Sequence, residues 1–285
     1  AESGFLPGGV GWYRKTFVVP KKYQEKQLMI EFDGAYMNAE VYLNGTKLGE
    51  HPYGYTAFAF DLTEGLICDG ETENVLVVKT NNKIPSSRWY SGSGIYRDVK
   101  LTVTDKVHVG YNGTKIIAKD LENTKDKNVK VDVTATIDND SDTNKTITVK
   151  NTLLDAQGNA AGSTVTNEVE LAAKSTKDVK QEVSVIAPKL WSTEDTNLYT
   201  MKTEIVADNK VLDTYETEYG FRYFDFDNNT GFSLNGEKIK LKGVCLHHDQ
   251  GALGAVANRD AIERQVKILK EMGCNAIRVT HNPAA

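Results

Sequence analysis

Two stretches near the C-terminus, KLKGVCLHHD (residues 240–249) and NAIRVTHNP (residues 275–283), decide the fold of that part of the chain. Each is a short apolar strand that ends in polar, chemically active side chains, and a helical segment separates the two strands. The order strand, loop, helix, strand predicts the opening of a parallel sheet or barrel. Polar strand ends of this kind are typical of a (β/α)8 barrel, which needs roughly 250 residues and eight strands. Residues 220–285 therefore predict only the first part of such a barrel.

The predicted helix between these strands has one apolar face, formed by Ile262, Val266 and Leu269. Asp260 lies near its start, where an acidic side chain suits the helix dipole. Gly273 is well placed to end the helix in a left-handed conformation. These signals support a crossover helix that joins two parallel strands.

The first module, residues 1–105, has the period-two alternation of β-strands. Apolar residues alternate along 28–32 and 58–62, and Asn44-Gly45 is a strong hairpin signal because both residues tolerate positive φ. Short strands with regular turn signals predict a jelly-roll sandwich.

The second module, residues 106–219, is also β but has a different character. Apolar residues alternate along 129–137, and about seven short strands are expected over the module. This pattern predicts an immunoglobulin-like sandwich that acts as a spacer. The predicted fold is thus mainly β: a jelly roll, an immunoglobulin-like sandwich, and the first βαβ part of a (β/α)8 barrel.

The composition argues against several classes of function. Of the 285 residues, 40% are hydrophobic and 26% are charged, which is ordinary for a soluble globular protein. The net charge is −5 and basic residues are scattered, which argues against nucleic acid as a partner. Apolar runs are too short to span a membrane. The wide spacing of Cys68, Cys245 and Cys274 fits neither a disulfide framework nor a zinc site.

No basic-then-apolar leader precedes Gly11, so we expect no signal peptide within this chain. The first residue is not Met, and the compartment therefore stays open between a cytoplasmic and a secreted bacterial-type enzyme. A homo-oligomer is compatible with the composition.

Three side chains at the predicted strand ends could bind a ligand: His247, Arg278 and His281. The C-terminal ends of barrel strands converge on one site, where a guanidinium and neutral imidazoles can hold hydroxyl or carboxylate groups. The alternative is that these residues only cap the strands. His247 and His248 should point to opposite faces, which argues against a metal held by both.

The loop SSRWYSGSG (residues 86–94) holds a second set of candidates. Aromatic rings stack on the apolar faces of sugars, and a guanidinium bonds their hydroxyl groups, so Trp89 and Arg88 could form a sugar site. Equally, Trp89 could plug the end of the sandwich and Arg88 could be an ordinary ion-pair partner.

Other aromatic residues could extend such a platform, but core or interdomain packing is the favoured interpretation for most of them: Trp12, Tyr13, Tyr36, Tyr53 and Tyr55.

Four motifs together carry a family resemblance: GWYRK (11–15), SGSGIYRDV (91–99), KGVCLHHD (242–249) and NAIRVTHNP (275–283). In this order they resemble the N-terminal part of glycoside hydrolase family 2, most closely its β-galactosidases. The resemblance spans nearly the whole chain. It implies a jelly-roll sugar-binding domain, an immunoglobulin-like domain and the start of the catalytic barrel.

The resemblance also implies retaining hydrolysis of terminal β-galactosides by two glutamates. In the family both glutamates lie on later barrel strands, as do the magnesium ligands. We therefore expect no catalytic residue, no metal site and no cofactor in this chain. Any Mg²⁺ would be bound by other parts of the longer protein. Asp249 lies at the predicted rim, but a lone carboxylate cannot carry out the two-step reaction.

The resemblance implies that some residues of this chain bind the substrate. His247, Arg278 and His281 match positions that line the sugar subsite of the family, and Arg88 lies on the jelly-roll loop directed toward it. Some members place an Asp near that loop to hold sodium. Because Arg88 departs from that pattern, no sodium is predicted, and the guanidinium could contact a sugar hydroxyl.

Three alternatives stay open. A β-glucuronidase would need cationic groups for the carboxylate of its substrate. A non-catalytic carbohydrate-binding protein would bind sugars without hydrolysing them. A purely structural β module would bind no sugar and would have a packed Trp89.

Overall fold

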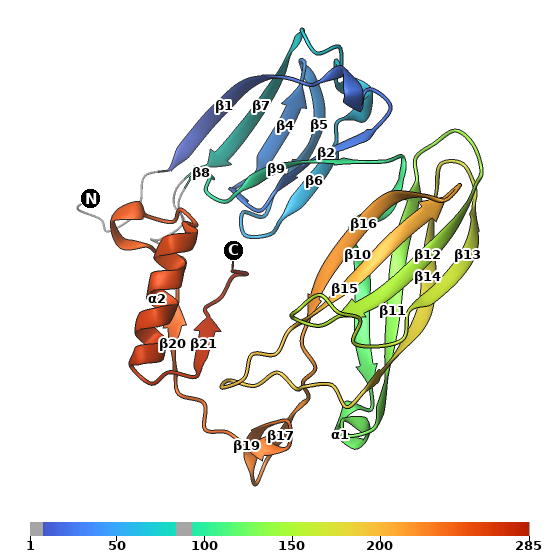
Figure 1. The fold of residues 1–285 in the computed structure, drawn as a ribbon. Helices are drawn as coiled ribbons and strands as arrows, with labels where there is room; N and C mark the ends of the chain where they lie inside the picture. The colour runs from blue at the N-terminus through green and yellow to red at the C-terminus, as the bar shows by residue number, and fades with distance from the viewer. Residues whose placement is uncertain (1–7, 84–92, 285) are drawn as a thin grey trace. The chain divides into compact units, whose positions relative to one another are not determined.

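The structure is a computed structural model, and it describes residues 8–83 and 93–284. Figure 1 shows a mainly β chain with several antiparallel sheets and one short βαβ segment at its C-terminal end. The chain forms two compact units. We call residues 1–103 with 241–285 the jelly-roll–barrel unit, and residues 104–240 the immunoglobulin-like unit.

The jelly-roll part contains two main sheets and a short strand pair. One sheet has the order β1 (Gly9–Val18), β7 (Glu73–Asn82), β4 (Ala39–Leu43) and β5 (Thr46–His51). The other has the order β6 (Phe58–Asp61), β2 (Gln27–Phe32) and β9 (Val99–Thr104), and β3 (Ala35–Tyr36) pairs with β8 (Gly94–Ile95). Two short 3-10 helices, η1 (Lys21–Tyr23) and η2 (Thr63–Gly65), connect strands.

The core of the jelly roll follows from the predicted alternation. Inward residues of β2 and β4 are buried, among them Leu28, Phe32 and Val41. The rings of Phe32 and Phe58 stack with centroids 4.9 Å apart. Asn44 and Gly45 both have positive φ, 49° and 87°, which confirms the predicted hairpin turn between β4 and β5.

The barrel part of this unit is one βαβ segment. β20 (Gly243–Leu246) pairs in parallel with β21 (Ala276–Val279), and η3 (Gly251–Leu253) and α2 (Arg259–Glu271) lie between them in sequence. The side chain of Asn258 accepts a hydrogen bond from the amide of Ala261 at 3.0 Å and caps α2. Gly273 has a φ of 91°, so the glycine ends the helix as predicted.

The immunoglobulin-like unit is a seven-stranded sandwich. One sheet has the order β10 (Val107–Lys119), β11 (Asn128–Asn139) and β14 (Ser175–Ile186). The other has the order β13 (Val165–Leu171), β12 (Lys145–Leu154), β15 (Tyr199–Ala207) and β16 (Lys210–Tyr219). The helix α1 (Leu121–Thr124) and a small sheet of β17 (Phe224–Asp227), β18 (Gly231–Leu234) and β19 (Glu237–Lys238) complete the unit. The predicted fold class is confirmed.

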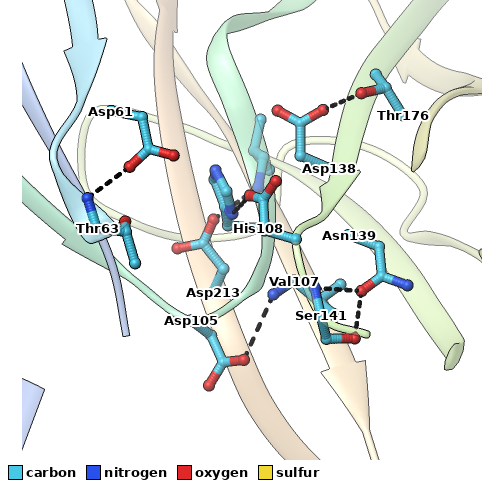
Figure 2. Close-up of polar contacts among 12 residues, drawn as sticks. Asp61, Thr63, Asp105, Val107, His108, Asp138, Asn139, Ser141, Thr176 and Asp213 are labelled. Atoms are coloured by element: carbon cyan, nitrogen blue, oxygen red, sulfur yellow. Dashed lines mark hydrogen bonds and ion pairs between the residues drawn. The ribbon is translucent and has the colours of Figure 1, made fainter. Parts of the chain in front are cut away.

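Polar side chains at one end of this sandwich fasten its turns, as Figure 2 shows. Asn139 accepts hydrogen bonds from the backbone and hydroxyl of Ser141, and Thr176 donates to Asp138 across the pair β11–β14. The imidazole of the buried His108 lies 3.7 Å from the carboxylate of Asp140. The hydrogen bonds of Asn139 and Thr176 fix the turns and give this end a structural role.

Candidate functional site

The two rim histidines meet at the C-terminal ends of the barrel strands. β20 and β21 run in parallel and in register, with Leu246 opposite Val279, so the residues after them emerge at one edge. The rings of His247 and His281 lie 5.6 Å apart between centroids, at 66° to each other. The structure therefore brings together two of the three rim residues that were proposed from the sequence.

Arg278 is opposite Cys245 in the pair β20–β21, and it precedes His281 by three residues. Its guanidinium approaches the Cys245 sulfur at 3.8 Å, and the side chain is exposed. The Thr280 hydroxyl and then the Arg278 guanidinium lower the pKa of the Cys245 thiol below its ordinary value. Arg278 thus adds an exposed positive charge to the strand pair that leads to the two rim histidines.

Both strand ends turn sharply away from the sheet. His248 and His281 have φ values of 59° and 74°, in the left-handed region that costs a residue with a side chain about 1–3 kcal/mol. This turn gives the two neighbouring histidines different ring contacts, although both line one cavity. His247 faces His281, whereas His248 packs 5.0 Å from the ring of Tyr55 in the jelly roll.

The jelly roll fixes the barrel rim through a buried arginine. Arg97 is 8% exposed, and its guanidinium donates to the carbonyl oxygens of Pro283 at 2.7 Å, Tyr55 at 3.2 Å and Asp33 at 3.3 Å. Because Pro283 lies two residues after His281, the arginine holds the segment that carries the rim imidazole.

A group of tyrosines completes this contact. Tyr55 packs edge-on against Tyr36 at 5.0 Å and lies 5.8 Å from Tyr53. Tyr53 donates its hydroxyl to Asn282 at 2.9 Å. Tyr53 and Tyr55 therefore contact the rim, and Tyr36 packs against Tyr55, in line with the packing favoured from the sequence. Trp12 and Tyr13 lie on β1 and are 61% and 41% exposed.

A cavity of about 250 Å³ lies at this junction. Arg97 of the jelly roll and His247, His248, Asp249 and Gln265 of the barrel part contribute to its lining. Its walls thus combine a cation, imidazoles, a carboxylate and an amide, which are groups that recognise a polar, hydroxyl-rich ligand.

Within residues 8–83 and 93–284, no group of three or more His, Cys, Asp or Glu side chains is arranged to hold a metal ion. In the same described part of the chain, no helix is long and apolar enough to cross a membrane.

Arg88 and Trp89, the jelly-roll candidates, lie outside the described residues. The residue that sequence reasoning missed is Arg97, which lines the cavity and holds the rim segment through Pro283. Arg97 belongs to the motif SGSGIYRDV, so a signal was present, but its role depends on a contact with Pro283, 186 positions later.

The described chain thus combines a jelly roll, an immunoglobulin-like sandwich and the first parallel strand pair of a barrel. Comparison with known families gives three matches: "Glycosyl hydrolases family 2, sugar binding domain" over residues 6–105, "Glycosyl hydrolases family 2" over 114–222, and "Glycosyl hydrolases family 2, TIM barrel domain" over 227–285. The chain belongs to glycosyl hydrolases family 2.

Individual relatives support this membership. The chain is 46% identical over 283 residues to the β-galactosidase BoGH2A of Bacteroides ovatus, covering 99% of this chain and 32% of the relative. It is 34% identical over 300 residues to a β-glucuronidase of Formosa agariphila, covering 97% of this chain and 30% of the relative. A solved family 2 structure from Bacteroides cellulosilyticus superposes with a TM-score of 0.91 at 35% identity, covering 98% of this chain and 35% of that one. The chain thus spans about a third of the length of these proteins.

The imidazole of His248 allows a pH prediction. Burial lowers the pKa of His248 below its ordinary value, opposed by the hydrogen bond to the Asn282 carbonyl. The folded state therefore binds this proton less readily than the unfolded state, so the contribution of His248 to stability is complete above pH about 6.5 and is lost as the pH falls below it.

A titration of the His248 Cε1–H resonance by NMR should give a midpoint below the ordinary histidine value. The His248→Gln variant should lose the corresponding part of the acid sensitivity in urea unfolding. A midpoint at or above the ordinary value would contradict this prediction.

Proposed function

We propose that the protein carrying this chain is a retaining glycoside hydrolase that cleaves terminal β-galactosides. In this proposal His247, Arg278 and His281 bind the hydroxyl groups of the terminal sugar, with Arg88 as a further hydrogen-bond donor and Trp89 as a stacking surface. The observation that carries it is the facing pair His247–His281, 5.6 Å apart on the rim of the barrel strands. The 46% identity to a protein named as a β-galactosidase supports the choice of sugar.

The reaction itself needs groups that we assign to later barrel strands. Retaining hydrolysis uses two carboxyl groups about 5–5.5 Å apart, one as nucleophile and one as acid and base. The rim residues of this chain would position the sugar ring and exclude water from its bound face. The 285-residue chain should therefore be inactive.

One specific observation favours a second candidate, a β-glucuronidase. The exposed guanidinium of Arg278 could pair with a uronate carboxylate, and a relative with 34% identity carries that name. Discrimination between the two sugars then depends on whether Arg278 meets a hydroxyl or a carboxylate.

The assay compares the longer protein with the 285-residue chain on 4-nitrophenyl β-galactoside and β-glucuronide. We expect the longer protein to prefer the galactoside by at least about tenfold in kcat/KM, equivalent to about 1.4 kcal/mol. The 285-residue chain should release no nitrophenol from either substrate. Preference for the glucuronide would favour the second candidate, and turnover by the short chain would overturn the assignment of the catalytic groups to later strands.

A further inference from the structure

The outer face of the sheet β1–β7–β4–β5 carries an ordered row of polar and aromatic side chains. Lys79 of β7 is opposite Trp12 of β1 on one side and Glu40 of β4 on the other. Directly paired residues of an antiparallel sheet point to the same face, so these three side chains stand in one row. Their neighbours in sequence, Val41 and Val78, are buried, which places the row on the face opposite the core.

Trp12 is the largest apolar group of this row and is 61% exposed. The Lys79 ammonium lies over the indole, 5.6 Å from its centroid, and Tyr42 lies 6.2 Å away with its ring tilted by 35°. The cation–π contact holds one side of the indole toward the sheet. The high exposure leaves the other side open as a flat, held surface.

The polar groups beside the indole are fixed by one another. Glu40 accepts hydrogen bonds from Lys79 and from the Tyr42 hydroxyl, each at 2.6 Å, and Lys47 lies 3.4 Å from the same carboxylate. The hydrogen bond from Lys79, followed by that from Tyr42, lowers the pKa of Glu40 to about 2, so the carboxylate is ionised at neutral pH. All three charged side chains retain contact with water.

This combination of groups discriminates between possible ligands. An apolar protein surface or a lipid would have to remove water from an ionised carboxylate and two ammonium groups, which is unfavourable without new partners. A sugar ring suits both parts, since its C–H groups can stack on the indole while its hydroxyls bond to the charged groups. β-Galactose is well matched, because its axial O4 leaves the opposite ring face as a continuous C–H surface.

We propose that Trp12, Tyr42, Glu40 and Lys79 form a binding site for a neutral β-galactan chain on the outer face of the jelly roll. The choice of galactose rests on the proposed function, whereas the site rests on the geometry of the sheet face. The site would hold a polymeric substrate to the protein, with Trp12 as the stacking residue. It shares no residue with the lining of the rim cavity.

The test measures binding by the complete 285-residue chain, using isothermal titration with β-1,4-galactotetraose and affinity electrophoresis through gels that contain soluble β-1,4-galactan. Trp12→Ala should raise the Kd for galactotetraose by at least about tenfold, equivalent to about 1.4 kcal/mol. Trp12→Phe should retain part of the affinity, because it keeps a smaller aromatic face. Phe226→Ala is the matched control, since Phe226 is an equally exposed aromatic residue, 67% exposed, in the immunoglobulin-like unit.

An NMR experiment locates the bound ligand. The chain has three tryptophans, so the indole N–H resonance of Trp12 can be assigned by its loss in Trp12→Phe and should shift when galactotetraose is added. Equal binding by wild type and Trp12→Ala, or no binding by wild type, would overturn the site. A change in sedimentation of Trp12→Ala without a change in galactan binding would also overturn it, because the face would then join two copies.

A parallel titration with a soluble β-glucuronan separates this proposal from the proposed function. Binding to the glucuronan alone that depends on Trp12 would overturn the galactan assignment together with the choice of sugar. If galactan binding does not depend on Trp12 while the longer protein still turns over galactosides, only this inference is overturned.

Discussion

Replacing Phe221 by alanine should lower the free energy of unfolding of the immunoglobulin-like unit by about 3–5 kcal/mol, the range for removing a fully buried aromatic ring. Phe221 has no exposed surface. Its ring packs edge-on against Tyr199 at 5.1 Å and Tyr219 at 5.0 Å, and its carbonyl accepts a hydrogen bond from the amide of Trp191. The truncated side chain would leave a cavity between β15 and β16.

The chain has two units, so the measurement must report on one of them. Hydrogen exchange in a urea series, followed by mass spectrometry of peptides from β15 and β16, measures the free energy of unfolding of the immunoglobulin-like unit. Phe226→Ala is the control, because Phe226 is 67% exposed and its loss should change stability by less than about 0.5 kcal/mol. Equal effects of the two substitutions would show that Phe221 does not organise the core.

Replacing Arg97 by methionine should lower the stability of the jelly-roll–barrel unit by more than about 3 kcal/mol, since it removes three hydrogen bonds and those from a charged donor contribute about 1.5–3 kcal/mol each. The change removes the donors to Pro283, Tyr55 and Asp33. Amides of residues 280–282 should then exchange faster, because the rim loses its anchor in the jelly roll. Arg97→Lys should fall between wild type and methionine, as an ammonium cannot reach three divergent carbonyls at once.

Lys100→Met provides the matched control for Arg97. Lys100 also contacts Asp33, through an ion pair of 2.9 Å, but its side chain is more than half exposed. An exposed ion pair contributes at most about 1 kcal/mol, so this variant should leave amide exchange at residues 280–282 unchanged. Faster exchange there in both variants would indicate general loosening of the sandwich, and Arg97 would no longer count as the anchor.

Local sequence patterns predicted the elements that depend on neighbouring residues. The alternation along 28–32 and 129–137 identified strands, and Gly273 marked the end of α2, because each signal acts within a few positions. The approach of His247 and His281 was predicted for a similar reason, since parallel strands bring their ends to one edge.

Contacts between distant parts of the chain could not be predicted in this way. Arg97 and Pro283 are 186 positions apart, and no periodicity indicates that they meet. The sequence favoured packing for most of the aromatic residues, including Trp12 and Tyr55. Only the structure shows that Trp12 points outward on β1, whereas Tyr55 packs against His248 at the barrel rim. The roles of Arg88 and Trp89 stay predictions, as they lie outside the described residues.

The discontinuous make-up of the jelly-roll–barrel unit has a consequence for synthesis on the ribosome. The 186 positions between Arg97 and its acceptor Pro283 take about 10–40 s to translate at about 5–20 residues per second. During that interval the nascent jelly roll carries a guanidinium that lacks its acceptor on Pro283 and tyrosines that lack their partners on the rim, while the intervening sandwich can already fold. Pauses in translation between these positions would lengthen the exposure of this surface to chaperones.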